Sequence, residues 1–160
     1  MAGQVVAIHV AGAAGAAMQS LAAAEAIAGE GLAGDRYRAG IGFYSATPTD
    51  PGARELTLIA EESLDAVLRE TGVAVAPEEH RRNITTRAIA LDPLLGKRFR
   101  IGEVICEGVR PCPPCKHLEE ITGKKISLRR GDMSLTVPIG ICTFQTTSAF
   151  REIRLRQLGK

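Results

Sequence analysis

Short apolar runs rich in β-branched residues recur along this chain, and they limit its fold more than any other feature of the sequence. Residues 4–10 form one such run and lead into a glycine-containing loop. Residues 54–59 alternate apolar and polar side chains, which is typical of a strand. Residues 97–109 contain two apolar runs interrupted by Gly102-Glu103, which predicts a hairpin.

Helical periodicity is confined to a few places. Residues 60–71 carry apolar side chains at helical spacing, and Gly72 follows as a natural C-terminal cap. Residues 16–28 are rich in alanine, so helix propensity by itself predicts a helix there. Strands and helices do not alternate as they do in βαβ units, and no repeat is present. We therefore expect a mainly β fold, a strand-rich barrel with one or two short helices.

The length of 160 residues suits a single domain with a hydrophobic core that needs no disulfide or metal, so we expect residues 1–160 to form one domain. No apolar run approaches the roughly 18 residues of a membrane-spanning helix. No Lys or Arg precedes the first apolar stretch, as it would in a secretory signal. We expect a cytoplasmic protein that does not act at a membrane.

The net charge of +2 gives no reason to expect a nucleic-acid partner. The charge is unevenly distributed, however. Residues 124–160 contain eight Lys or Arg and two acidic residues, a net charge of +6, which leaves −4 for residues 1–123. This C-terminal segment is either a solvated basic tail or an arm that binds an anion or a polymer.

Residues 29–42 contain five glycines, and they surround Asp35 and Arg36. Such a segment is expected to turn tightly and to present side chains and backbone amides to a ligand. An ordinary turn closed by an ion pair between Asp35 and Arg36 is equally compatible with these residues.

A second polar cluster spans residues 80–86 and reads His-Arg-Arg-Asn-Ile-Thr-Thr. Arginine forks and an amide are the groups that bind a phosphate or a carboxylate, so Arg82 and Asn83 are candidate ligand-binding residues. A solvated run of charge explains the cluster equally well. His9 lies in an apolar run and is expected to be a core residue with its hydrogen bonds satisfied.

The segment Cys112-Pro113-Pro114-Cys115 follows a predicted strand and precedes a predicted short helix that ends at Gly123. Cys115 would lie in the first helical turn, close to cationic residues. A helix N-terminus and nearby cations favour the thiolate, which is both a nucleophile and a metal ligand. Cys115 is therefore the candidate reactive thiol, and Cys112 is the candidate resolving or auxiliary thiol.

Other roles for this CxxC pair remain open. It could form half of a zinc site, a dithiol redox pair or two incidental buried cysteines. Zinc would require two further ligands, and there is no second CxxC or HxxxH to supply them. A thioredoxin-like pair would follow the first strand of a βαβ unit, which this chain lacks. Cys106 and Cys142 lie in apolar runs and are expected to be core residues.

Four of these segments, taken in order, resemble the signature of MOSC domains. They are Gly31-x-x-Gly34-Asp35-Arg36-Tyr37 followed by Glu55-Leu56-Thr57-Leu58-Ile59, then Arg82-Asn83-Ile84, then Leu91 and Leu94-x-Gly96-x-x-Phe99-x-Ile101-Gly102, and finally Cys112-x-x-Cys115-x-x-Leu118-Glu119. The resemblance covers residues 4–123 and is to the short, stand-alone bacterial members of the family. It implies a MOSC-type β-barrel, with residues 21–28 extended rather than helical.

The resemblance also implies a link to the molybdenum cofactor (molybdopterin). Cys115 would carry persulfide sulfur for that cofactor, or would be the metal ligand that holds it through a Mo–S bond while N-oxygenated compounds are reduced. A thiolate suits either role because it binds soft, sulfur-loving centres. Cys112 would assist Cys115.

The anionic phosphate of the pterin would suit Arg36 and Arg82, with Asp35 and Asn83 as hydrogen-bond partners of its polar edges. The expected partners are this small-molecule cofactor and a protein that donates sulfur or electrons. The alternatives are a binding module that recognises a pterin or a metal–sulfur assembly without chemistry of its own, and a structural zinc protein that uses the CxxC.

Two features depart from the family pattern. Tyr37 stands where the family often has His, which removes an acid–base group from that position. Residues 124–160 form an atypical basic segment without the sequence pattern of the family's closing strands, which are therefore either missing or rebuilt, so the resemblance gives no support for closure of the barrel at the C-terminus.

Overall fold

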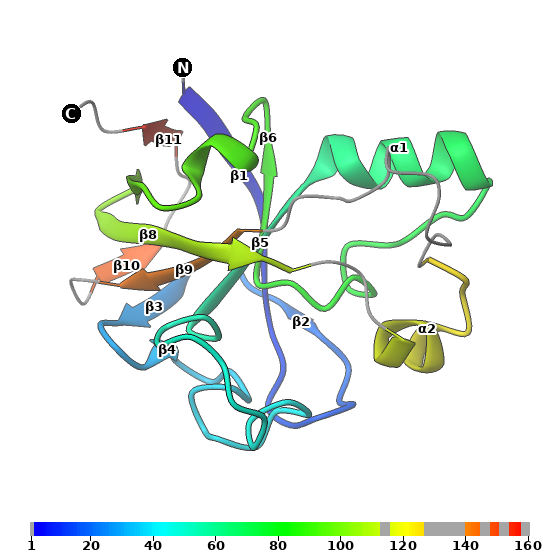
Figure 1. The fold of residues 1–160 in the computed structure, drawn as a ribbon, viewed down its shortest axis with the longest axis horizontal. Helices are drawn as coiled ribbons and strands as arrows, with labels where there is room; N and C mark the ends of the chain where they lie inside the picture. The colour runs from blue at the N-terminus through cyan, green and yellow to red at the C-terminus, as the bar shows by residue number, and fades with distance from the viewer. Residues whose placement is uncertain (1, 113–115, 127–139, 145–147, 151–153, 158–160) are drawn as a thin grey trace.

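The computed structural model describes residues 2–112, 116–126, 140–144, 148–150 and 154–157 (Figure 1). Strands predominate in these residues, with two α-helices and one 3-10 turn. Figure 1 shows both α-helices on the same side of the molecule. The predicted mainly β fold with two short helices is confirmed. No helix in these ranges is long and apolar enough to cross a bilayer.

In the described part of the chain, eight strands form the main sheet in the order β11-β7-β8-β9-β5-β6-β1-β2. β11 also pairs with β1. All neighbours are antiparallel except β5 and β6, which are parallel. The bounds are β1 Ala2–Val10, β2 Gln19–Ser20, β5 Leu56–Ala60, β6 Ile84–Arg87, β7 Arg98–Ile101, β8 Val104–Pro111, β9 Gly140–Phe144 and β11 Arg154–Gln157.

A smaller sheet has the order β10-β3-β4, with β10 at Ser148–Phe150, β3 at Ala24–Ile27 and β4 at Gly31–Leu32. It includes part of the alanine-rich segment 16–28, for which propensity predicted a helix. That prediction is wrong, and the extended chain implied by the family resemblance is found instead. Ala24 and Ala26, which are separated by one exposed residue, are both buried in β3. Pairing with β4 and β10 therefore outweighs the local helix preference.

The C-terminal segment is more than a solvated basic tail. β9 lies between β8 and β5 in the main sheet, and β11 pairs with both β7 and β1. These strands come from residues 140–157, where the sequence resemblance had ended. Their positions depend on partners far away in the sequence, which a local pattern cannot reveal.

The helices begin and end where short-range chemistry predicts. α1 (Glu61–Thr71) starts directly after β5 with two acidic residues in its first turn, and it ends at Gly72, whose left-handed backbone (φ 71°) donates its N–H to the carbonyl of Leu68. It forms the connection between parallel strands β5 and β6. α2 (Lys116–Thr122) ends at Gly123, as predicted. The 3-10 turn η1 (Asp92–Leu94) precedes the predicted hairpin of β7 and β8, which is confirmed.

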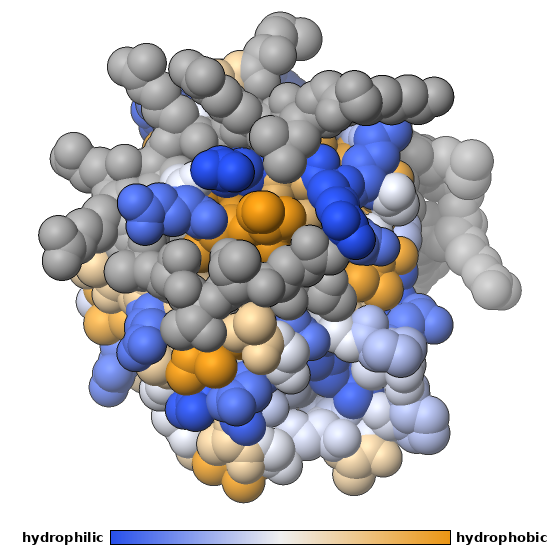
Figure 2. Space-filling view, turned by 90° about the vertical axis from the view of Figure 1, so that its left-hand side faces the viewer, coloured by the Kyte–Doolittle hydropathy of each residue, from blue (hydrophilic) through white to orange (hydrophobic). Residues whose placement is uncertain are grey.

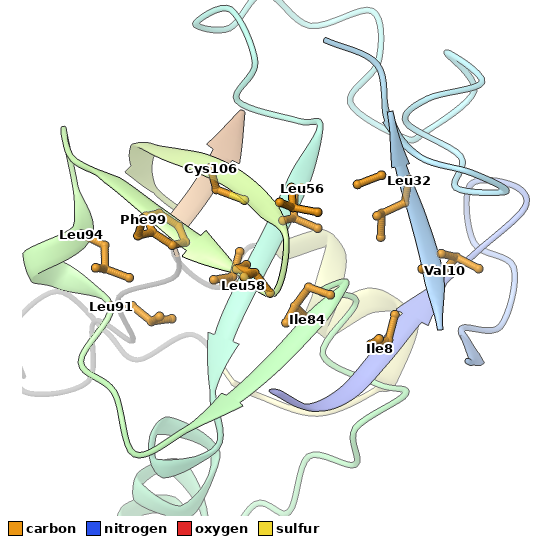
Figure 3. Close-up of a cluster of buried hydrophobic side chains, with 14 of the residues drawn as sticks. Ile8, Val10, Leu32, Leu56, Leu58, Ile84, Leu91, Leu94, Phe99 and Cys106 are labelled. Carbon is orange, nitrogen blue, oxygen red and sulfur yellow. The ribbon is translucent and has the colours of Figure 1, made fainter. Parts of the chain in front are cut away.

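The main core is a continuous cluster of buried apolar side chains. It extends from one side of the main sheet to the smaller sheet, through residues that include Leu91, Leu94, Phe99, Cys106, Leu56, Leu58, Ile84, Ile8, Val10 and Leu32 (Figure 3). Burial of each large apolar side chain contributes about 1.5–3 kcal/mol. All five residues of β5 are buried, although the sequence alternation suggested one solvated face. Leu56, Leu58 and Ala60 belong to the main core, whereas Ile59 packs with Val67 of α1 in a second small cluster. Both faces of the strand are therefore covered, and Thr57 becomes a buried polar residue.

The outer surface on the side of the β7–β8 turn is mixed. Among the described residues visible in Figure 2, hydrophobic residues form small groups between hydrophilic ones. Scattered apolar residues of this kind are normal on a protein surface.

Candidate functional site

A cavity of about 740 Å³ opens next to α2. Its walls come from the loop between β4 and β5, from the segment that precedes β6, from the end of β8 and from the start of α2. These segments include the glycine-rich loop, the His-Arg-Arg cluster and the cysteine segment that the sequence singled out. The fold therefore brings three distant motifs to one pocket.

The described lining of the pocket is strongly cationic. It contains the five arginines 36, 54, 81, 82 and 110, against one acidic residue, Asp50. Of the predicted cofactor-binding residues, Arg36 and Arg82 belong to this lining, whereas Asp35 and Asn83 are not among the residues that line it. Guanidinium groups gathered in a concave site suit a phosphate or a carboxylate.

Asp35 is buried behind the pocket wall. Its Oδ2 accepts hydrogen bonds from the Ala11 backbone N–H (3.3 Å), from Nη1 of Arg36 (3.2 Å) and from Nδ2 of Asn83 (3.1 Å). Its Oδ1 accepts the Tyr37 N–H at 3.0 Å. These bonds close the turn and fix the Arg36 guanidinium, which lies 4.8 Å from the centre of the Tyr37 ring.

Asn83 ties three elements together below the pocket. Its Nδ2 donates to the His9 carbonyl (3.1 Å) and to Asp35, and its Oδ1 accepts from the N–H (3.2 Å) and Oγ1 (2.9 Å) of Thr57. Both amide hydrogens and both lone-pair directions of the side chain are therefore in use. Asn83 is 3% exposed, so breaking these bonds would leave buried groups without partners.

Arg81 adopts a left-handed backbone conformation, with φ 63°. Its carbonyl accepts a hydrogen bond from Nη2 of Arg36 (3.2 Å), and its own Nη1 donates to the Ala16 carbonyl. Burial and the nearby Arg36 charge lower the pKa of Arg81 below its ordinary value. A non-glycine residue in this region costs free energy, and such strain is concentrated at functional sites.

His80 also lines the pocket but does not titrate near neutral pH. Its Nδ1 accepts the Arg82 N–H at 3.0 Å, which leaves Nε2 to donate to Oγ1 of Thr85 at 3.1 Å. Burial is the main cause that lowers the pKa of His80 to about 3. His9 packs edge-on against it and is buried, as the sequence predicted, although its Nδ1 has no hydrogen-bond partner among the described residues.

Cys112 is half-buried and lines the pocket. Its carbonyl accepts a hydrogen bond from Nη2 of Arg82 at 3.3 Å, and it packs against the small apolar cluster formed around Ile59 and Val67. Cys115, the predicted reactive thiol and metal ligand, lies outside the described residues. Cys106 is fully buried in the core, as predicted, and the side chain of Cys142 in β9 is also outside the described part.

Residues 28–142 match the sequence profile of the MOSC domain. The chain belongs to the MOSC domain family. The match confirms the predicted resemblance and extends it beyond residue 123 into the C-terminal segment. No curated protein matches the sequence significantly.

Solved structures with this MOSC fold come from several bacteria. The YuaD protein of Bacillus subtilis has a TM-score of 0.75 at 15% identity, over 99% of this chain and 98% of that chain. YiiM of Geobacillus stearothermophilus has a TM-score of 0.70 at 12% identity, over 98% and 75% of the two chains. YiiM of Escherichia coli has a TM-score of 0.68 at 15% identity, over 98% and 70%. Identities this low establish a shared fold alone.

The MOSC pocket has an aromatic side that the sequence analysis missed. The Phe43 ring stacks on His117 of α2, with centroids 3.4 Å apart and planes 13° apart, and Tyr44 meets both rings edge-on. A Cβ on Gly42 would lie 2.5–2.9 Å from three atoms of the Tyr37 ring, so only glycine allows Tyr37 to pack there. The Gly-Phe-Tyr run in the glycine-rich region was the available signal.

Arginines and aromatic faces together suit a planar, anionic ligand. Guanidinium groups bind the anion, and aromatic rings contact a flat heterocycle. The residues of this MOSC pocket therefore fit a phosphorylated pterin. The described residues contain no group of three or more His, Cys, Asp or Glu side chains that could hold a metal, and Cys115 of the predicted zinc pair lies outside them.

Proposed function

We propose that this MOSC domain handles the molybdenum cofactor or the sulfur of that cofactor, with Cys115 as persulfide carrier or molybdenum ligand. The observation that carries the proposal is the pocket of about 740 Å³, in which five arginines and an aromatic side adjoin Cys112. When bound, the cofactor supplies a molybdenum centre able to reduce N-hydroxylated compounds. The steps below concern the residues of the chain itself.

Arg36 and Arg82 bind the anionic phosphate in this proposal. Both belong to the pocket lining, and the position of each is fixed by the fold: Arg36 by its ion pair with Asp35, and Arg82 by its bond to the Cys112 carbonyl. Fixed guanidinium groups lose little conformational entropy when they bind an anion. Asp35 and Asn83 then act from behind the wall, as positioning residues for Arg36.

The proposed role of Cys115 rests on its sequence neighbours. Cys112 and His117, which precede and follow it closely in the chain, both line the pocket. A thiolate near this concentration of positive charge is favoured, because cations stabilise the anionic sulfur. A thiolate there could carry sulfane sulfur from a donor protein, with Cys112 assisting in its release.

We further propose that the main sheet closes as the barrel expected of the family. The pairing of β11 with both β7 and β1 supports closure, because β11 is the first strand of the sheet order and β1 lies near its other end. Closure would remove exposed strand edges from the sheet and hold the pocket walls in a rigid frame.

The test is the metal and pterin content of protein purified from a host that makes the molybdenum cofactor. Wild type is compared with Cys115→Ala, Arg82→Ala and the control Arg100→Ala. Arg100 carries the same charge but is exposed on β7, away from the pocket lining. Molybdenum and pterin should be present in wild type and Arg100→Ala, and should fall in both other variants.

The other outcomes distinguish the alternatives. Absence of molybdenum and pterin from wild type would exclude a tightly held cofactor, and a persulfide on Cys115 would then be sought by mass spectrometry. Zinc near one equivalent would favour the structural zinc site. Cofactor without turnover of N-hydroxylated compounds would favour a binding module.

A further inference from the structure

α2 is attached to the rest of the protein mainly by contacts at its ends. Leu118 is its one buried residue, and His117 in its first turn stacks on Phe43 and meets Tyr44 edge-on. A seven-residue helix with so little buried apolar surface has little intrinsic stability and depends on its tertiary contacts. The position of Cys112, which lies between β8 and α2 in the chain, therefore depends on what holds this helix.

One attachment lies just beyond the C-terminal end of α2. Nζ of Lys124 contacts both carboxylate oxygens of Glu79, at 2.7 and 2.6 Å, and donates to the Ala74 carbonyl at 2.7 Å. Both ends of this ion pair are about one-third exposed, at 33% and 30%. The Lys124 N–H donates to Oγ1 of Thr122, which orients the residue relative to the last turn of α2. The Glu79 carboxylate is itself fixed by the Ala76 N–H at 2.7 Å.

The second attachment lies before the N-terminal end of α2, where Arg82 donates to the Cys112 carbonyl. Glu79 and Arg82 are three residues apart, so one short segment of the chain contacts both Cys112, which precedes α2, and Lys124, which follows it. The same segment carries the pocket arginines Arg81 and Arg82. Hence the ion pair ties the chain just beyond α2 to the segment that carries the arginine wall of the pocket.

We propose that Glu79 and Lys124 are positioning residues that hold α2 against the pocket and thereby keep Cys112 beside the arginines. The effect of this ion pair on thiol chemistry rests on the function proposed above, whereas its attachment of α2 to the pocket does not. Neither residue lines the pocket, so its effect on the thiols is transmitted through α2. Breaking the ion pair lets α2 move away, which exposes Cys112.

The test measures two properties of the ligand-free protein. Hydrogen exchange of the α2 amides reports opening of the helix, with α1 as an internal reference. Alkylation of Cys112, followed in a Cys115→Ala background, reports access to the thiol. The variants Glu79→Gln and Lys124→Met break the pair, Lys124→Arg retains it, and Glu30→Gln is the control. Glu30 pairs with Arg38 at 2.8 Å, at a surface site remote in sequence from α2.

We expect Glu79→Gln and Lys124→Met each to raise both rates about fivefold, the effect of losing a partly exposed ion pair. The double variant should equal Lys124→Met, because once the lysine is absent no ion pair remains for Glu79→Gln to break. Lys124→Arg and Glu30→Gln should match wild type. In wild type, but not in Lys124→Met, added salt should raise the Cys112 rate.

Unchanged exchange and alkylation rates in both Glu79→Gln and Lys124→Met, or strictly additive effects in the double variant, would refute the proposal that this ion pair holds α2 in place. Faster exchange in α1 as well as in α2 would indicate a global loss of structure and would contradict the proposal. Fast exchange of α2 in Lys124→Arg would contradict it too. If the protein holds no cofactor and carries no persulfide on Cys115, the proposed function fails and these rates are unaffected, so the two failures are distinguishable.

Discussion

Asn83 provides a sharp test of how the pocket is supported. Asn83→Ala should remove four hydrogen bonds at once and leave the His9 carbonyl, the Thr57 N–H and the Thr57 hydroxyl without the side-chain amide. Each buried group without a partner costs about 1–3 kcal/mol. Allowing for some relaxation and entry of water, we expect the free energy of unfolding to fall by about 4 kcal/mol. That is a large part of the roughly 5–15 kcal/mol typical of a domain.

The assay is urea denaturation followed by circular dichroism. With a slope of about 2 kcal/mol per molar urea, the midpoint should fall by roughly 2 M. The exposed substitution Arg100→Ala should leave the midpoint unchanged. A loss below about 1 kcal/mol for Asn83→Ala would refute the view that this amide holds the pocket floor together.

Asn83→Asp should change how the free energy of unfolding depends on pH. The substitution keeps the shape of the side chain but sets a second carboxyl about 3 Å from that of Asp35, where Nδ2 lies 3.1 Å from Oδ2 in the wild type. Repulsion between the two carboxylates should raise the pKa of the introduced carboxyl, because its protonated form can donate to Asp35. The protonated carboxyl therefore stabilises the folded variant at low pH, and this stabilisation is lost as pH rises through the raised pKa.

The difference in unfolding free energy between wild type and Asn83→Asp should therefore shrink as pH falls from 7 towards 5. The difference between wild type and Asn83→Ala should stay constant. Equal pH dependence of the two variants would show that the amide hydrogens of Asn83 do not face Asp35 as described.

Two further predictions concern packing and titration. Gly108→Ala should destabilise the protein by several kcal/mol in the same urea assay, since a Cβ would lie 2.2 Å from the carbonyl oxygen of Leu94, whereas Gly12→Ala meets nothing within 4 Å and should be nearly neutral. Burial lowers the pKa of His80 from 6.5 to about 3, so the unfolded chain binds a proton in this window that the folded protein does not. As pH falls from 6 to 4, the wild type should thus lose about 1 kcal/mol of unfolding free energy per pH unit, and His80→Gln should lose less. Equal slopes of unfolding free energy against pH for the two proteins would contradict the neutral, buried imidazole.

The local elements could be read from the sequence because their causes are local. Helix α1 follows from apolar residues at helical spacing and from Gly72, whose left-handed conformation ends it. The β7–β8 hairpin follows from two apolar runs around Gly102, which has a positive φ of 58°. The ordered motifs were also sufficient to indicate the MOSC family, because their residue types and spacings are properties of the sequence itself.

The roles of individual site residues were less accessible. Asp35 and Arg36 looked alike as candidates, yet Arg36 lines the pocket while Asp35 is used up by internal hydrogen bonds. Nothing in the sequence indicated that Arg81 has a left-handed backbone or that Phe43 stacks on His117. These roles are set by neighbours that lie tens of residues away in the chain.

The sequence by itself thus determined the family, the main strands, the helices and the motifs that meet at the pocket. Only the tertiary structure decided that the alanine-rich segment is extended, that β9 and β11 belong to the main sheet, and which polar residues face the cavity. The physical reason is the range of the interactions. Caps and turns act over a few residues, whereas strand pairing and burial depend on partners brought together only by folding.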